Sequence, residues 1–235
     1  GNDSITKTIL KGNVGIGTTG PASLLDITKT AIGATQSDAY GLSLVNTTAA
    51  ALDAQQYSPP LRWRGFGWKT DATAASQSVD FRSFVRPIQG AAAPTGGLDF
   101  QSSINGAAYS NLVTILSSGN VGIGTTIPNT LLTVAGPVSL NAPSTKTAAY
   151  SLVATDSSLI FNGSASITLT LQAASSYSGR ILYVKTIAAY TVVSASSNVV
   201  PLDSATAGTA ILAATAGKWA MLQSDGTNWV IMAAN

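Results

Sequence analysis

Apolar and polar residues alternate along most of this chain with a period of two, the period of a β-strand. The alternating stretches are rich in β-branched and aromatic residues, and clusters of Gly, Ser, Asn and Pro separate them at intervals typical of sandwiches and jelly rolls. Residues 49–56 (AAALDAQQ) are the best candidate for a short helical turn. The pattern predicts an all-β protein. Its clearest strands are expected within residues 79–88 (VDFRSFVRPI), 98–104, 109–116, 166–172, 180–186, 190–195 and 217–233.

A long internal repeat divides the chain. Residues 12–27 read GNVGIGTTGPASLLDI and residues 119–134 read GNVGIGTTIPNTLLTV, so eleven of sixteen positions are identical. The two copies start 107 residues apart, which is too long a period for stacked solenoid repeats and indicates a recurring connector. The predicted parts are a first neck (1–28), an inserted β-sandwich module (29–116), a second neck (117–140) and a C-terminal β-module (141–235).

Each neck predicts a short strand with one bulky face and one bare face. In the second copy Val121 and Ile123 alternate with Gly122 and Gly124, and the first copy has the same pattern. Glycine weakens a strand unless another backbone must approach it closely, and one short strand buries nothing alone. Three copies wound about an axis, with the Val and Ile side chains inward, would satisfy both conditions. The alternative is a glycine-rich hairpin in a monomer.

The C-terminal residues predict a hairpin. Asp225-Gly226 is a two-residue turn signature, which would place Leu222 opposite Trp229. Both faces of this hairpin are apolar, and Trp219 lies on the face opposite to Trp229. We therefore expect burial on both sides, either inside a sandwich or at a trimer axis, with both tryptophans in the core.

Composition excludes several kinds of chemistry. The chain has no Cys and no His, and all ten of its acidic residues are Asp. These absences remove disulfides, thiolates and the commonest metal ligand and general base, and we predict no metal and no cofactor. The formal charge of +2 is too small to favour nucleic acid, and no stretch approaches the roughly 18 apolar residues of a membrane span. Charged residues are only 9% of the chain, which suits a neutral, self-associating fibre.

The repeat, GNVGIGTT followed by Pro and a Leu-Leu pair, resembles the shaft motif of phage tail fibres and of related trimeric bacterial fibre adhesins. Residues 55–70 (QQYSPPLRWRGFGWKT) and 74–120 are similar to a module that precedes this motif in such fibres. The segments SGRILYVK and LQSDGTNWVIM resemble their terminal β-module. The resemblance implies a parallel homotrimer with a distal target-binding surface, extracellular on a virion tail or a bacterial cell. The self-cleaving chaperone domain that ends many such fibres has no counterpart in this sequence.

Aromatic residues are the candidates for glycan binding, because sugar C–H faces stack on their rings. The insert gathers Tyr57, Trp63 and Trp68 beside two arginines. Large aromatics are mostly buried. The favoured interpretation is therefore that Trp63 and Trp68 fill the core of the insert and that the arginines pair with Asp80 or Asp99.

Loops of the terminal module are the preferred binding surface, because polar loops at a fibre tip meet the target first. The expected ligand-binding residues there are Tyr177 and Tyr190 for stacking, with Asn198 and Asp203 for the sugar hydroxyls.

Three functions are compatible with these observations. The first is a receptor-binding or adhesin end of a homotrimeric fibre that grips cell-surface glycans, and the second is a purely structural shaft segment. The third is a polysaccharide depolymerase, which usually needs two carboxylates. No motif places Asp53, Asp71, Asp80 or Asp99 together as such a pair. We therefore expect binding without catalysis and no catalytic residues.

Overall fold

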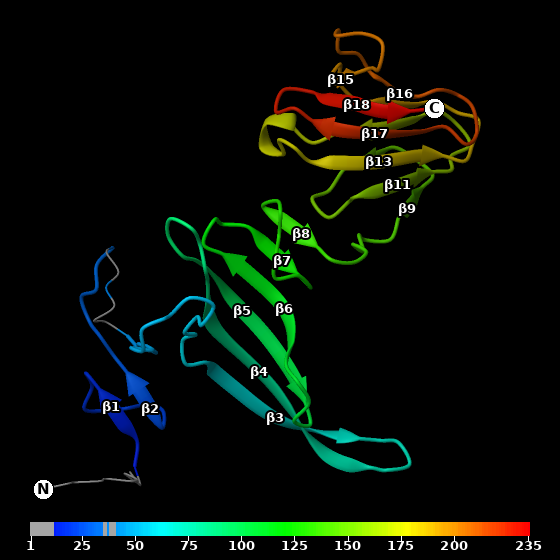
Figure 1. Cartoon of the computed structure of the whole chain (residues 1–235). Coiled ribbons are helices and arrows are strands. Elements are labelled where there is room, and N and C mark those ends of the chain that lie inside the picture. Colours follow the sequence, from blue (N-terminus) through cyan, green and yellow to red (C-terminus); the bar gives the residue numbers. More distant parts are fainter. Residues whose placement is uncertain (1–11, 35–36, 38–40) are drawn as a thin grey trace, which may run out of the picture. The chain divides into compact units, whose positions relative to one another are not determined.

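The computed structural model describes residues 12–34, 37 and 41–235, and its contacts divide the chain after Pro137 into two compact units (Figure 1). Part of the predicted first neck, residues 1–11, lies outside the described residues. The all-β prediction is confirmed, because the described residues form strands and one 3-10 helix, η2 (Ala174–Ser176). The helical turn predicted for residues 49–56 is wrong, since Ala51 and Ala54 close a β-turn there.

The two copies of the repeat adopt the same local structure. Strand β1 (Val14–Ile16) pairs in parallel with β2 (Leu25–Ile27), and β7 (Val121–Ile123) pairs in parallel with β8 (Leu132–Val134). In both copies the Val that starts the first strand lies opposite the Leu that starts the second. In both copies the Asn before the first strand also donates its side-chain amide to the carbonyl of the loop Pro, at 3.1 and 3.2 Å.

The glycines of the repeat are required by the turn of their own chain. A Cβ on Gly122 would lie 2.4 Å from the carbonyl oxygen of Thr125, and one on Gly15 would lie 2.4 Å from that of Thr18. Gly124 has φ of +73°, which favours glycine. The expectation that these glycines admit the backbone of a neighbouring chain is therefore wrong for Gly15 and Gly122, because the backbone that approaches them belongs to the same chain.

One twisted six-stranded sheet contains both the insert and the second neck. Strands β3 (Leu61–Lys69), β4 (Ala75–Ile88), β5 (Thr95–Ile104) and β6 (Ser110–Leu116) form an antiparallel meander, and β7 and β8 continue it in the order β3-β4-β5-β6-β7-β8 (Figure 1). These four strands lie in a single sheet, so the sandwich predicted for residues 29–116 is not formed by the described residues of that range. The strands alternate as a sandwich strand does, but the described residues of the insert form no second sheet against them.

Pairing register gives this sheet two different faces. The described residues leave the apolar face largely uncovered, where Trp63 is 52% and Phe81 47% exposed. The polar face, with one buried phenylalanine, carries the paired charges. Besides Lys69, Gln77, Ser83 and Ser102, the apolar face carries Leu61, Trp63, Val79, Phe81, Val85, Leu98, Phe100, Ile104, Val113, Ile115, Val121, Ile123, Leu132 and Val134. The polar face includes Arg62, Arg64, Asp80, Arg82, Phe84, Arg86, Asp99, Gln101 and Thr114.

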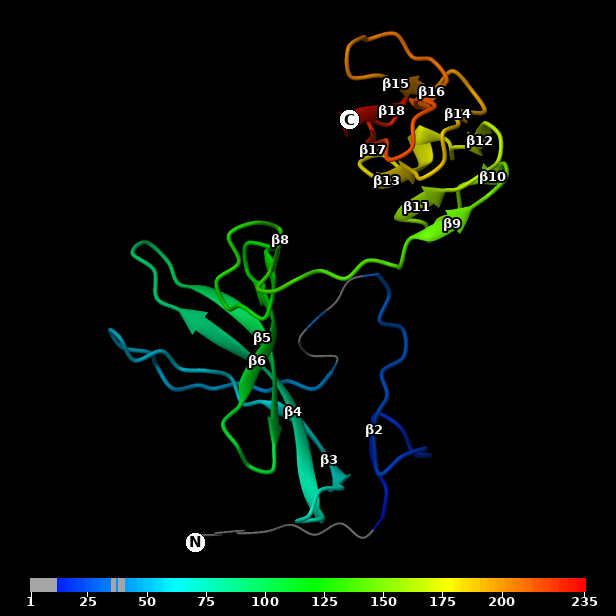
Figure 2. The ribbon, with the colours of Figure 1, turned by 90° about the vertical axis from the view of Figure 1, so that its right-hand side faces the viewer.

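The C-terminal unit winds successive strands alternately into two sheets. A four-stranded sheet has the order β10-β12-β14-β16, and a six-stranded sheet has the order β15-β18-β17-β13-β11-β9, with the two seen as separate layers in Figure 2. Strands β9, β11 and β13 run parallel, as do β10, β12 and β14, so the unit is a sandwich wound like a short solenoid. The bounds are β9 (Ser144–Lys146), β10 (Tyr150–Ser151), β11 (Ser158–Phe161), β12 (Ile167–Thr170), β13 (Ile181–Thr186), β14 (Val192–Ser194), β15 (Val199–Val200), β16 (Ala210–Leu212), β17 (Trp219–Ser224) and β18 (Trp229–Ala234).

The core of this unit lies between the two sheets. Strand β13 illustrates how the sequence builds it, since Leu182 and Val184 point inward and are buried whereas Ile181 and Tyr183 point outward. Buried residues contributed by both sheets form one cluster: Leu152, Leu159, Phe161, Ile167, Leu169, Leu171, Ala174, Leu182, Val184, Val192, Val199, Ile211, Leu212, Ala220, Leu222, Trp229 and Ile231.

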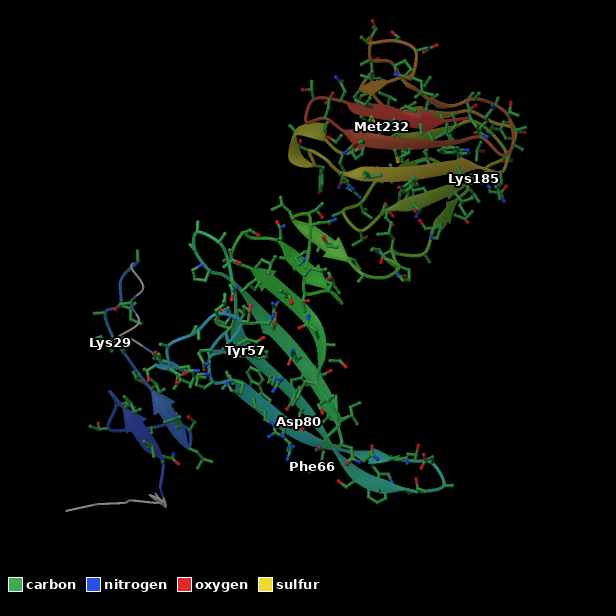
Figure 3. All side chains as sticks on the ribbon, viewed as in Figure 1. Lys29, Tyr57, Phe66, Asp80, Lys185 and Met232 are labelled. Atoms are coloured by element: carbon green, nitrogen blue, oxygen red, sulfur yellow. The ribbon has the colours of Figure 1, made fainter. Side chains whose placement is uncertain are left out.

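The β17–β18 hairpin forms, but its predicted register is wrong by two residues. Its loop has four residues, Asp225–Asn228, and Ser224 lies opposite Trp229. An even shift leaves the two faces unchanged, and Trp229 is fully buried as predicted. The predicted burial of the opposite face inside a sandwich is wrong, because Trp219 is 39% and Met232 51% exposed there (Met232 is labelled in Figure 3), and its burial at a trimer axis stays a prediction.

Candidate ligand-binding site

Residues just before β3 continue along the edge of β4, and the Tyr57 side chain reaches the polar face of the sheet. The backbone N–H of Ser58 donates to the carbonyl of Val85 at 3.1 Å, and the Val85 N–H donates to Ser58 Oγ at 2.9 Å. The side-chain amide of Asn46 donates to the carbonyl of Tyr57 at 2.9 Å. These bonds hold the Tyr57 ring against Phe84, with ring centroids 5.7 Å apart and an angle of 19° between the ring planes.

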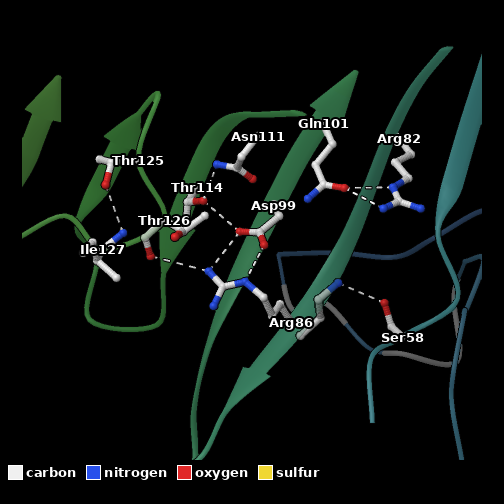
Figure 4. Close-up of polar contacts among 11 residues, drawn as sticks. Ser58, Arg82, Arg86, Asp99, Gln101, Asn111, Thr114, Thr125, Thr126 and Ile127 are labelled. Atoms are coloured by element: carbon white, nitrogen blue, oxygen red, sulfur yellow. Dashed lines mark hydrogen bonds and ion pairs between the residues drawn. The ribbon is translucent and has the colours of Figure 1, made fainter. Parts of the chain in front are cut away.

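Arg82 lies beside this aromatic pair in a fixed orientation. Its Nε and Nη2 both donate to Gln101 Oε1, at 2.9 and 2.7 Å (Figure 4). The guanidinium carbon is 3.8 Å from the centroid of the Tyr109 ring and 5.1 Å from that of Phe84. Both contacts are cation–π interactions. No carboxylate among the described residues forms an ion pair with Arg82.

A second arginine, Arg86, is neutralised by a buried carboxylate. Its Nε donates to Asp99 Oδ2 at 2.6 Å, and the Thr114 hydroxyl donates to Asp99 Oδ1 at 2.8 Å. The hydrogen bond to Asp99 raises the pKa of the Arg86 guanidinium above its ordinary value. The Asn111 amide donates in turn to the Thr114 hydroxyl at 3.0 Å. This chain of polar contacts ties β4, β5 and β6 together below the aromatic pair.

These side chains surround a cavity of about 450 Å³ on the polar face. The strands β4 and β5 form its floor, the segment before β3 forms one wall, and the loop of the second repeat contributes a threonine whose carbonyl lies 3.5 Å from Arg86 Nη2. Its lining residues are Tyr57, Ser58, Pro60, Arg82, Phe84, Arg86, Asp99, Gln101 and Thr126. An exposed aromatic ring, a guanidinium and neutral amide and hydroxyl groups meet in one concave site, which is suited to noncovalent binding of a polyhydroxylated ligand.

The other arginines of the insert are structural. Arg62 and Arg64 both bind Asp80, each at 2.8 Å, and the Asp80 carboxylate is buried between them (Figure 3 labels Asp80). The predicted pairing of these arginines with Asp80 is therefore confirmed. The predicted core positions of Trp63 and Trp68 are wrong within the chain, because Trp63 lies on the uncovered apolar face and Trp68, near the end of β3, is 68% exposed.

Among the predicted ligand-binding residues of the insert, only Tyr57 lines this cavity. Those of the terminal module do not form one site. Tyr177 precedes β13 and Tyr190 follows it, so they lie beyond opposite ends of a strand about 20 Å long. Asn198 Oδ1 accepts a 2.6 Å hydrogen bond from Ser194 Oγ within its own turn, and Asp203 lies in an exposed turn. Tyr177 stacks near the guanidinium of Arg180, with the carbon 5.0 Å from the ring centroid.

Sequence reasoning missed the residues at the centre of the cavity. Arg82, Phe84 and Arg86 alternate within VDFRSFVRPI, so the period of two already placed them on one face. Gln101 joins them only through the pairing of β4 with β5, which brings Arg82 opposite Gln101. The alternation within β4 was visible in the sequence. The strand that pairs with β4, and the register of that pairing, were not.

No protein-family model matches the chain, and a search of curated proteins finds no significant match. Across residues 12–34, 37 and 41–235, no three His, Cys, Asp or Glu side chains gather into a possible metal site. Within those same residues, no helix is long and apolar enough to cross a membrane. Function is therefore inferred from the two faces of the sheet and from the cavity.

Proposed function

We propose that this chain is the target-recognition segment of an extracellular homotrimeric fibre that binds glycans on a cell surface. In the assembly, three copies bury the apolar faces of their β3–β8 sheets against one another and present the polar faces outward. The fibre belongs on a virion tail or a bacterial cell. The observation that carries the proposal is the uncovered apolar face. The opposite, polar face of the same sheet holds the cavity, so burial of the apolar face leaves the cavity at the surface.

The N-terminal unit lacks a core of its own. Among its described residues, Phe84 and Pro128 are the only apolar side chains that are buried. Fully burying a large apolar side chain contributes about 1.5–3 kcal/mol. In a single chain, half-exposed residues such as Trp63 and Phe81 therefore each lack about 1 kcal/mol of the stabilisation that full burial would contribute. Ten exposed apolar side chains along the apolar face amount to the core that the unit lacks.

Copies of the same chain fit this face better than a different partner does. From Arg62 to Asp99, the charged side chains of the sheet lie on the polar face, apart from Lys69 at the end of β3. A face that is apolar except for one charge at its end is complementary to itself. The second repeat extends the face with Val121 and Ile123, and the first repeat presents the same residue types on β1. The repeat thus continues the buried surface along the fibre.

Glycan binding follows from the polar face. In a trimer the cavity occurs three times, so weak individual sites gain avidity on a surface that carries many copies of the ligand. The carboxylates nearest the cavity are held by arginines, Asp99 by Arg86 and Asp80 by Arg62 and Arg64, an arrangement for structure and binding more than for acid catalysis. We propose binding without cleavage.

Light scattering on the intact chain tests the assembly. The expected mass is three times 23.8 kDa, independent of concentration. Replacing Phe81 with Glu places a charge on the apolar face and should yield monomers. Phe66→Glu is the matched control, because Phe66 is 73% exposed and lies on the other face, opposite Ser78 (Phe66 is labelled in Figure 3). A wild-type mass of 23.8 kDa, or equal effects of the two substitutions, would overturn the trimer.

A glycan array tests recognition and separates it from the structural alternative. The trimer should bind a subset of printed glycans. A trimer that binds none of them would support a shaft segment that only spaces the fibre, while a change in the length of bound glycans over time would instead indicate a depolymerase.

A further inference from the structure

The cavity on the polar face carries one unbalanced positive charge. Its lining has two guanidiniums, Arg82 and Arg86, and one carboxylate, Asp99, so the sum is +1. Asp99 is committed to Arg86 through the 2.6 Å contact and to the Thr114 hydroxyl. Arg82 has only the neutral Gln101 as a hydrogen-bond partner among the described side chains. The positive charge of the cavity therefore resides on Arg82.

Arg82 is held ready for an anion. Two of its N–H groups are used by Gln101, and the others remain for a ligand. The guanidinium also lies over the Tyr109 and Phe84 rings, so little side-chain entropy is lost when a ligand binds. A planar guanidinium with free edge donors matches the geometry of a carboxylate.

Next to this charge stands a surface for a sugar ring. Tyr57 is packed on Phe84 through one face of its ring, and it is 47% exposed. The exposed part of the ring offers a stacking platform for the C–H groups of a pyranose. Gln101 and Thr126 border the same cavity and can bind sugar hydroxyls.

Resting on the proposed glycan binding, we infer that the ligand is an acidic saccharide, one whose sugar ring bears a carboxylate. The carboxylate binds Arg82, and the ring lies against Tyr57. The site that selects the target is therefore on the sheet, and the tyrosines of the terminal module are not part of it.

The test compares acidic with neutral sugars on the intact chain. An array of both kinds is followed by saturation-transfer NMR with methyl β-D-glucuronide and methyl β-D-glucoside, which differ only at C6. We expect acidic glycans to be bound in preference to neutral ones. Arg82→Gln should weaken that binding about 10- to 100-fold, the usual worth of a hydrogen bond to a charged group. Arg62→Gln is the control, because it removes the same charge from the same face outside the cavity and leaves Asp80 paired with Arg64.

The outcomes separate this inference from the proposed function. Preference for neutral glycans, or equal binding by Arg82→Gln and wild type, would overturn the acidic ligand and leave glycan binding intact. Binding of no glycan at all would overturn both. If Arg82→Gln fails to fold, the salt dependence of binding by the wild-type chain still tests the role of Arg82. Its binding of acidic glycans should weaken in about 0.5 M NaCl, where charges are screened, and salt-insensitive binding would count against Arg82.

Discussion

Adding a methyl group at Gly122 is the sharpest perturbation of the repeat. The Cβ of Gly122→Ala would lie 2.4 Å from the carbonyl oxygen of Thr125, 3.0 Å from its Cγ2 and 3.3 Å from Pro128 Cδ. The nearest of these atoms is backbone, so the loop between β7 and β8 must move. Overpacking of this kind costs about 1–3 kcal/mol. Since 1.4 kcal/mol is a factor of ten, amide protection at this end of the sheet should fall about 5- to 150-fold.

Hydrogen exchange with mass spectrometry of the intact chain measures the effect. The reporting amides are those of Val121, Gly124 and Ala135, which donate to Leu131, Leu112 and Ile123 respectively, each at 2.9 Å. Gly136→Ala is the matched control, because its Cβ would meet nothing within 4 Å. Equal protection in the two variants would refute the idea that the glycine is required by the turn of its own chain.

Two further predictions concern carboxylates. Asp99→Asn should destabilise the N-terminal unit by about 2–4 kcal/mol, because it leaves the largely buried Arg86 without its counter-charge. Asp80→Asn should cost only about 1 kcal/mol, because the two arginines it releases are more than 40% exposed. Urea titrations rank the two, and the reverse order would contradict the assignment. The amides of Asn228 and Thr227 hold the pKa of Asp225 below its ordinary 3.8. The stabilisation of this turn is therefore complete above pH 3.8 and is lost as pH falls through the lowered pKa. An NMR titration of the Asp225 carboxyl with a midpoint at or above 3.8 would contradict it.

The strands could be predicted from the sequence wherever alternation was regular, as in Ile181–Thr186, whose residues alternate between exposed and buried. Pairing register could not be predicted where side chains determine the turn. The Asp225-Gly226 pair suggested a two-residue turn. The Asp225 carboxylate instead accepts the N–H groups of Thr227 and Asn228, both at 2.7 Å, and stabilises a four-residue loop.

The candidate site could be predicted only in part, because its residues are brought together by pairing between strands that are distant in the sequence. Tyr57 was a candidate because it is aromatic and belongs to a segment with two tryptophans and two arginines, and it lines the cavity. Its neighbours Arg82 and Gln101 are 19 residues apart in the sequence, and only the β4–β5 register brings them together. Core positions in the insert were misjudged for a related reason. Alternation specifies an apolar face, but it does not say whether the layer that covers this face belongs to the same chain.

The parallel pairing within each repeat has a mechanical consequence. The chain enters at the start of β7 and leaves at the end of β8, and the two strands run in the same direction. Tension along the chain therefore pulls the strands past each other lengthwise. The bonds from the Val121 N–H to Leu131 and from the Ala135 N–H to Ile123 then bear the load together, in shear, whereas an unzipping hairpin loses its bonds one at a time. The first repeat has the same geometry at Val14 and Thr28, so both connectors are built to carry tension.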